Sequence, residues 1–164
     1  MVKIFTTGGT FDKIYDLKSN KLVVGKSQVE RILKRANIDF KFEIIELLKK
    51  DSLDITNEER EEIASRVLEE AGEYNIIIHG TDTIIQTSQL LKDKFKNNPS
   101  KSRFILIGAM TPAVIEESDA DFNLGFAVGA VRFQDPGVYM AFNGKVFSEF
   151  NLVKDMDQKI FKEI

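Results

Sequence analysis

Short apolar runs, rich in β-branched residues, recur along this chain and are separated by stretches with helical periodicity. A run that is apolar at consecutive positions is typical of a strand buried on both faces, as in a parallel sheet covered by helices. This alternation therefore predicts a helix-covered, mostly parallel sheet. The predicted strands are Val2 to Thr6, Phe40 to Leu48, Asn75 to Ile78, Arg103 to Ile107 and Gly137 to Phe142.

The clearest helical signal begins at Thr56. Thr56 and Glu59 have the spacing of a capping box, and Gly72 marks the end of the apolar pattern that follows. Three further helices are predicted over Ser27 to Ala36, from Ile84 to before Pro99, and over Phe122 to Phe133, and Phe104, Phe126 and Phe133 are expected in the core. Strands and helices in this order predict an α/β fold of three layers, Rossmann-like or flavodoxin-like.

Size and composition exclude several classes of protein. A chain of 164 residues fits one domain, residues 1–164, that buries a full core. The net charge of −3 gives no electrostatic support for binding nucleic acid or an anionic membrane. With no cysteine and one histidine, thiol catalysis, disulfides and a zinc cluster are not expected. The N-terminus has no signal-peptide pattern and no apolar run is long enough to span a bilayer, so we expect a cytoplasmic protein.

Two threonine-glycine motifs follow predicted strands directly, Thr7 to Thr10 and His79 to Thr83. In open α/β sheets, ligands bind beyond the carboxyl ends of the strands, where both motifs are expected. Thr10 offers a hydroxyl that could act as a nucleophile, and Thr81 and Asp82 add a second hydroxyl and a carboxylate. The sequence therefore predicts a site for a small polar molecule at this edge.

Each of these side chains also has a purely structural reading. Thr10 could cap a turn, and Asp82 could cap the helix that follows it. Ser52 follows the second predicted strand, in a segment that also reads as an ordinary strand-to-helix turn. His79 is expected to be packed and hydrogen-bonded rather than a general base. Gly8 and Gly9 lack the spacing of a dinucleotide or phosphate-binding loop, and paired carboxylates for sugar chemistry are missing.

Two segments have no strong pattern. The polar stretch from Asp12 to Lys21 is a candidate mobile loop over the site. The tail after Phe150 is rich in lysine and aspartate, and by composition alone Lys154 is a surface residue.

The two motifs resemble the signature motifs of the bacterial-type L-asparaginase and glutaminase-asparaginase family. The likeness extends over nearly the whole chain. It includes Val24-Gly25-Lys26, Asp51-Ser52, Gly108 to Pro112 and Ser118 to Leu124.

This resemblance implies hydrolysis of a side-chain carboxamide, without a cofactor or metal, through an acyl-enzyme formed on a threonine. The family's nucleophile falls on Thr10, and its second catalytic group falls on Thr81, Asp82 and, by spacing, Lys154. The serine that binds the substrate α-carboxylate falls on Ser52. The resemblance also implies substrate binding by Gly9, Asp51 and Gly80.

The chain departs from the family in three places. The family's loop tyrosine aligns on Leu22, and Tyr15 in the same loop is the expected substitute. A glutamine often follows the substrate serine, but here Leu53 does. Family enzymes are also about twice as long, with a C-terminal domain that is absent here, so we expect self-association, most simply as a homodimer. The alternative function is a non-catalytic domain that binds a small ligand or serves as a scaffold.

Overall fold

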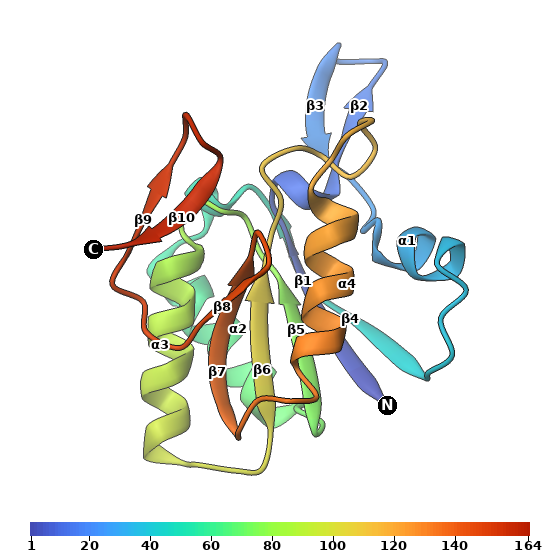
Figure 1. Ribbon diagram of the computed structural model, residues 1–164. Helices are drawn as coiled ribbons and strands as arrows, with labels where there is room; N and C mark the ends of the chain where they lie inside the picture. The colour runs from blue at the N-terminus through green and yellow to red at the C-terminus, as the bar shows by residue number, and fades with distance from the viewer.

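Five parallel strands and one short antiparallel strand form the central sheet of the computed structural model, which describes residues 1–164 (Figure 1). Strand β1 lies between β4 and β5, so the chain first crosses to one side and then to the other, as in flavodoxin-like sheets. This order confirms the predicted fold class and all five predicted strands. In sheet order the strands are β4 (Phe42–Lys50), β1 (Val2–Gly8), β5 (Tyr74–Ile78), β6 (Arg103–Ile107), β7 (Gly137–Phe142) and β8 (Lys145–Phe147).

Helices cover both faces of this sheet and confirm the four predicted helices (Figure 1). Successive side chains of a strand point to opposite faces, so Ile76 and Ile78 of β5 pack on one side while Ile77 packs on the other. The Thr56 capping box is present, with the Glu59 amide donating to Thr56 Oγ1. One face packs on α2 (Asn57–Glu69) and α3 (Ile84–Asn97), and the other on α1 (Val29–Arg35) and α4 (Ala120–Ala130). No helix is both long and apolar enough to cross a membrane.

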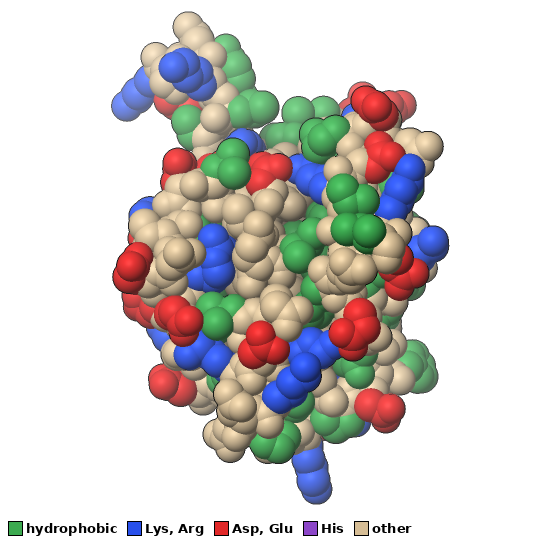
Figure 2. Space-filling view, turned by 90° about the vertical axis from the view of Figure 1, so that its left-hand side faces the viewer, with side chains coloured by type: hydrophobic (Ala, Val, Ile, Leu, Met, Phe, Trp, Pro, Cys, Tyr) green, Lys and Arg blue, Asp and Glu red, His purple; other side chains and the backbone are tan.

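Two antiparallel hairpins stand outside the sheet, beyond the carboxyl ends of its strands (Figure 1). The segment expected as a loop forms the first, β2 (Lys13–Asp16) paired with β3 (Lys21–Val24), and it projects from the body of the molecule (Figure 2). The C-terminal segment forms the second, β9 (Leu152–Asp155) paired with β10 (Ile160–Glu163). Strands of only four residues are too short for alternation to identify them in sequence, although Leu152 and Phe161 of the second hairpin are buried.

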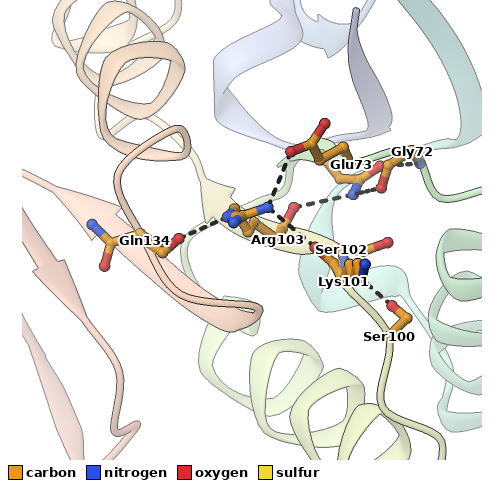
Figure 3. A network of polar contacts seen from close by, with 8 residues as sticks. Gly72, Glu73, Ser100, Lys101, Ser102, Arg103 and Gln134 are labelled. Carbon is orange, nitrogen blue, oxygen red and sulfur yellow. Dashed lines mark hydrogen bonds and ion pairs between the residues drawn. The ribbon is translucent and has the colours of Figure 1, made fainter.

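The amino ends of β5, β6 and β7 are linked at the opposite edge by Arg103 (Figure 3). Its Nε donates to the Gln134 carbonyl oxygen at 2.7 Å, and Nη1 donates to the Lys101 carbonyl oxygen and approaches Glu73. Near this edge one prediction is wrong. Phe133 is 87% exposed because α4 ends at Ala130, whereas Phe104 is buried as expected.

Candidate active site

The loops that follow β1 and β5 touch through glycine backbones. A Cβ atom on Gly9 would lie 2.4 Å from the Cα atom of Gly80, and a Cβ atom on Gly80 would lie 2.5 Å from Ser52 Oγ. Gly9 also has φ of +77°, which favours glycine. The absence of side chains at these two positions therefore lets three segments from separate strands meet at one point of the carboxyl edge.

Lys154 reaches this edge from the β9–β10 hairpin. Its Nζ donates to Thr81 Oγ1 at 2.7 Å and to Asp82 Oδ1 at 2.6 Å, although these residues are more than 70 positions away in sequence. Phe161, the cross-strand neighbour of Lys154, is buried against Phe142 and anchors the hairpin. The structure thus brings together the hydroxyl, carboxylate and ammonium groups that the resemblance implied. Asp82 does not cap α3, whose N-cap residue is Thr83 and has no side-chain capping bond.

Thr10 opens a single 3₁₀ turn, Thr10–Asp12, immediately after Gly9. Its side chain is partly buried, and its hydroxyl makes no hydrogen bond within the chain. The turn is closed by main-chain bonds, from Asp12 N to the Gly9 oxygen and from Lys13 N to the Thr10 oxygen. The capping reading of Thr10 therefore does not hold, and the hydroxyl is free to react with or bind a ligand.

Ser52 and Asp51 follow β4 at the same carboxyl edge of the sheet. Ser52 is 1% exposed and its Oγ has no hydrogen-bond partner, which is costly unless a ligand or water supplies one. Asp51 accepts from the Leu53 amide and pairs with Lys13 Nζ at 2.7 Å. Burial raises the pKa of Asp51, but the Lys13 ion pair, the Leu53 amide and the Lys154 ammonium outweigh it, so the pKa is lowered. Asp51 is therefore an anion at neutral pH.

Tyr15 lies on the projecting hairpin and is 55% exposed, with its hydroxyl 3.2 Å from Asn20 Oδ1. Tyr15 and Leu22 are direct cross-strand partners. Side chains of opposed residues lie on the same face of a hairpin, so the tyrosine here stands beside the position that the family's tyrosine would take. Its hydroxyl does not contact Thr10 in this arrangement, because its hydrogen bond is to Asn20.

His79 is structural, as predicted from the sequence. It is fully buried, and Nδ1 donates to the Gly80 carbonyl oxygen, because that oxygen can only accept. Nε2 must then accept from the Thr87 hydroxyl, whose oxygen accepts from Arg60. Burial, with a smaller contribution from the Arg60 charge, lowers the pKa of His79 to about 4. A neutral imidazole thus orients the Gly80 peptide beneath the site.

Two carboxylates that sequence reasoning did not single out shape the loops around the site. Asp119 accepts from the backbone amides of Met110 and Thr111 and so fixes the loop after β6. Asp12 is 2% exposed and bonds to Ser27 and Gln28. Asp119 lies in the segment Ser118 to Leu124 that carries the resemblance, but no role was assigned to it, and Asp12 has no sequence signal. A buried carboxylate looks like a surface one until the backbone amides around it are known.

Other candidate sites are poorly supported. A hollow of about 630 Å³ lies at the amino edge of the sheet, but the Arg103 and Glu73 side chains that line it bond to each other. No cluster of three or more His, Asp or Glu side chains is placed to hold a metal ion. Ser52 Oγ, which is buried without a partner, and the tight contacts of Gly9 and Gly80 are at the carboxyl edge.

Comparison with known proteins identifies relatives that match nearly the whole chain. A family model described as "Asparaginase, N-terminal" matches residues 1–160. The chain is 34% identical to the L-asparaginase of Thermococcus kodakarensis over 149 residues, which are 87% of this chain and 44% of that protein. A solved structure of the thermostable L-asparaginase from that organism matches with a TM-score of 0.81 at 28% identity, over 99% of this chain and 51% of that chain.

Two further solved structures share the fold. The probable cytoplasmic L-asparaginase from Campylobacter jejuni has a TM-score of 0.74 at 24% identity, and the L-asparaginase I from Vibrio cholerae has a TM-score of 0.76 at 22% identity. Each match covers 99% of this chain, but 52% and 50% of those chains. The chain therefore spans about half the length of the relatives it matches.

The glycine contact yields a stability prediction. Gly80→Ala places a methyl group against Ser52, and we expect it to lower the free energy of unfolding by about 1–3 kcal/mol. Gly125→Ala is the matched control, because a Cβ at that helical position meets nothing within 4 Å and should stabilise α4 by up to about 1 kcal/mol. Urea unfolding monitored by circular dichroism gives both values. Equal effects of the two substitutions would contradict the proposed tight contact.

The buried histidine yields a pH prediction. The unfolded chain takes up a proton at His79 near pH 6.5, while the folded chain does so only near pH 4. The stability that neutral His79 contributes is therefore complete above pH 6.5 and is lost as pH falls toward about 4. In His79→Asn the amide can still donate to Gly80 but does not titrate. As pH falls from 6.5 toward about 4, we expect the unfolding free energy of the wild type to decrease relative to that of the variant. A difference that stays constant with pH would refute this prediction.

Proposed function

The chain belongs to the asparaginase family, as a match to its N-terminal domain, and from this we propose that it hydrolyses the side-chain carboxamide of asparagine or a related small amide. The observation that carries the proposal is the contact of Lys154 with Thr81 and Asp82. The fold itself does not require this cluster, because the hairpin is already anchored by Phe161. The Lys154 side chain is 17% exposed, and burying a charged group is costly. A scaffold function does not require this burial.

In the proposed reaction, Thr10 Oγ1 adds to the amide carbon and the C–N bond breaks. The proton from the hydroxyl passes to the nitrogen, which leaves as ammonia, and the acyl group remains as an ester on Thr10. Water then adds to the ester, and Thr10 regains its proton as the acid leaves. Lys154, as the free amine, takes up the Thr10 proton through Thr81 and returns it to the leaving nitrogen. Asp82 orients the Lys154 side chain, and Tyr15 assists if the hairpin closes.

The proposed substrate contacts come from the three touching segments. Ser52 Oγ, buried without a partner, supplies a hydrogen bond to the α-carboxylate of an amino-acid substrate. Asp51, held as an anion, faces the α-ammonium group. Backbone N–H groups near Gly9, Gly80 and Thr81 stabilise the negative oxygen of the tetrahedral intermediate, a contribution of several kcal/mol when the donors are preorganised. No cofactor takes part, and we propose a cytoplasmic enzyme.

We expect the purified chain to release ammonia from asparagine, glutamine or another small carboxamide, and Thr10→Ala to lower this rate by about a thousandfold or more. Thr10→Ser keeps a hydroxyl and should retain measurable activity. Ser65→Ala is the control, since it removes a hydroxyl that makes no side-chain bond on α2, away from this edge. A glutamate dehydrogenase-coupled assay measures the ammonia.

Two outcomes would contradict this proposal. Activity that survives in Thr10→Ala would remove the nucleophile. A wild-type chain that is silent across the whole panel, yet binds an amino acid in equilibrium dialysis, would favour the non-catalytic ligand-binding function.

We also propose that the chain acts as a homodimer. Exposed large apolar side chains gather on the segments around the carboxyl edge, where soluble monomers rarely keep a contiguous patch. A second copy of the chain could cover these side chains if the same edge of both copies met. The exposed apolar residues around this edge are Tyr15, Leu17, Leu22, Val23, Leu53, Val114, Ile115, Val153 and Met156.

Light scattering after size exclusion should give twice the 18.6 kDa of one chain. Leu17→Glu is expected to shift the population toward monomer, because it places a charge in the apolar patch; Leu17 is 82% exposed. Phe133→Glu is the matched control, since Phe133 is equally exposed but lies at the opposite edge of the sheet. A wild-type mass of one chain at micromolar concentration would refute the dimer.

A further inference from the structure

Asp12 joins the two ends of the projecting β2–β3 hairpin. The hairpin leaves the body after Asp12 and returns at Gly25, and the Gly25 amide donates to the Asp12 carbonyl oxygen at 2.9 Å. The Asp12 side chain continues this link. Its Oδ1 accepts from Ser27 Oγ and from the Gln28 amide, both at 2.9 Å. One residue therefore holds the outgoing and the returning chain together with three hydrogen bonds.

Asp12 is also the last residue of the turn that presents Thr10. Its amide donates to the Gly9 carbonyl oxygen, and the next residue donates to the Thr10 carbonyl oxygen. The neighbouring Phe11 is fully buried, and its carbonyl oxygen accepts from the Ala113 amide. A movement of Asp12 would therefore move the hairpin base and the Thr10 turn together.

Beyond this base, few contacts hold the hairpin. The Lys13 ion pair with Asp51 and the packing of Gly25 against Ile14 lie at its foot, while its far end projects into solvent (Figure 2). The carboxylate of Asp16 near the tip bonds only within the hairpin, to Ser19 and Lys18. The position of the hairpin relative to the sheet is thus decided at its base.

We infer that Asp12 is a positioning residue, whose buried side chain fixes the base of the β2–β3 hairpin to the turn that carries Thr10. The catalytic consequence rests on the proposed function, because it assumes that Thr10 and the hairpin residue Tyr15 act in one reaction. The anchoring itself is independent of that assumption. Asp12 can do this because its carbonyl oxygen and its carboxylate both accept hydrogen bonds where the outgoing and returning chains meet.

The charge of Asp12 makes the anchoring depend on pH. Burial raises its pKa from 3.8 to about 6; the Gln28 amide and Ser27 hydroxyl oppose this, while Glu46 of β4 adds to it and Lys49 of β4 reduces it. When the base opens, the carboxyl group meets water and regains its ordinary pKa. The closed base thus binds the proton more tightly, so closure is favoured at low pH and weakens as pH rises from 3.8 to about 6.

Hydrogen exchange at the Gln28 amide tests the anchoring without any substrate. After correction for intrinsic exchange rates, we expect wild-type protection to fall as pH rises through about 6. Asp12→Asn keeps the acceptor oxygen and should abolish this pH dependence, while Asp12→Ala should lower protection about tenfold at every pH. Asp16→Asn is the matched control on the same hairpin and should behave as wild type. Wild-type protection in Asp12→Ala would overturn the inference.

Kinetics test the catalytic consequence. We expect Asp12→Ala to lower kcat for ammonia release about tenfold, Asp12→Asn to restore most of it, and Asp16→Asn to stay within about twofold of wild type. Lost protection with an unchanged kcat would overturn the coupling to Thr10. If the wild type released no ammonia, the proposed function would fail, but the exchange experiment would still decide whether Asp12 anchors the hairpin.

Discussion

The close approach of Gly9 to Gly80 is the constraint on which the site depends. Strands β1 and β5 are neighbours in the sheet, but their loops could diverge once the strands end. With no side chain on either glycine, the backbones pack at a distance that any Cβ would forbid, and Ser52 fits against the same point. The absence of a side chain at Gly9 and Gly80 therefore brings together the segments that carry Thr10, Thr81 and Ser52.

Behind this contact lies a hydrogen-bond chain whose direction is set at each step. Arg60 donates to Thr87, Thr87 to His79, and His79 to the Gly80 carbonyl oxygen. In an imidazolium ion both ring nitrogens carry a hydrogen, so Nε2 could no longer accept from the Thr87 hydroxyl. This agrees with the lowered pKa of His79. His79 and Asp12 are both buried and titrate with opposite signs, so their effects on stability partly cancel between pH 4 and pH 6. The fold tolerates these two buried titratable side chains because each has hydrogen-bond partners within the chain.

The sequence was sufficient for the five parallel strands, the four helices and the edge where the candidate residues gather, but not for the short strand β8. Runs such as Ile76 to Ile78 are buried on both faces, and this kind of burial leaves a strong pattern. The hairpins were missed because strands of only four residues are too short to leave a pattern. Lys154 was one lysine among many by composition, and only the family resemblance pointed to it. Asp12 had no signal at all, since its burial depends on where the chain returns after the hairpin.

The sequence distance between Lys154 and its partners has a consequence for how the site comes into being. The contacts of Lys154 with Thr81 and Asp82 close loops of more than 70 residues. The pairing of β1 with β5 closes a loop of the same size, whereas the other crossovers between neighbouring parallel strands close shorter ones. Long loop closures cost entropy and form slowly. The hairpin that carries Lys154 docks through Phe161 on Phe142 of β7, so the polar cluster is completed only after β7 is in place. During folding, the chain acquires its shape before it acquires the ammonium group of its site.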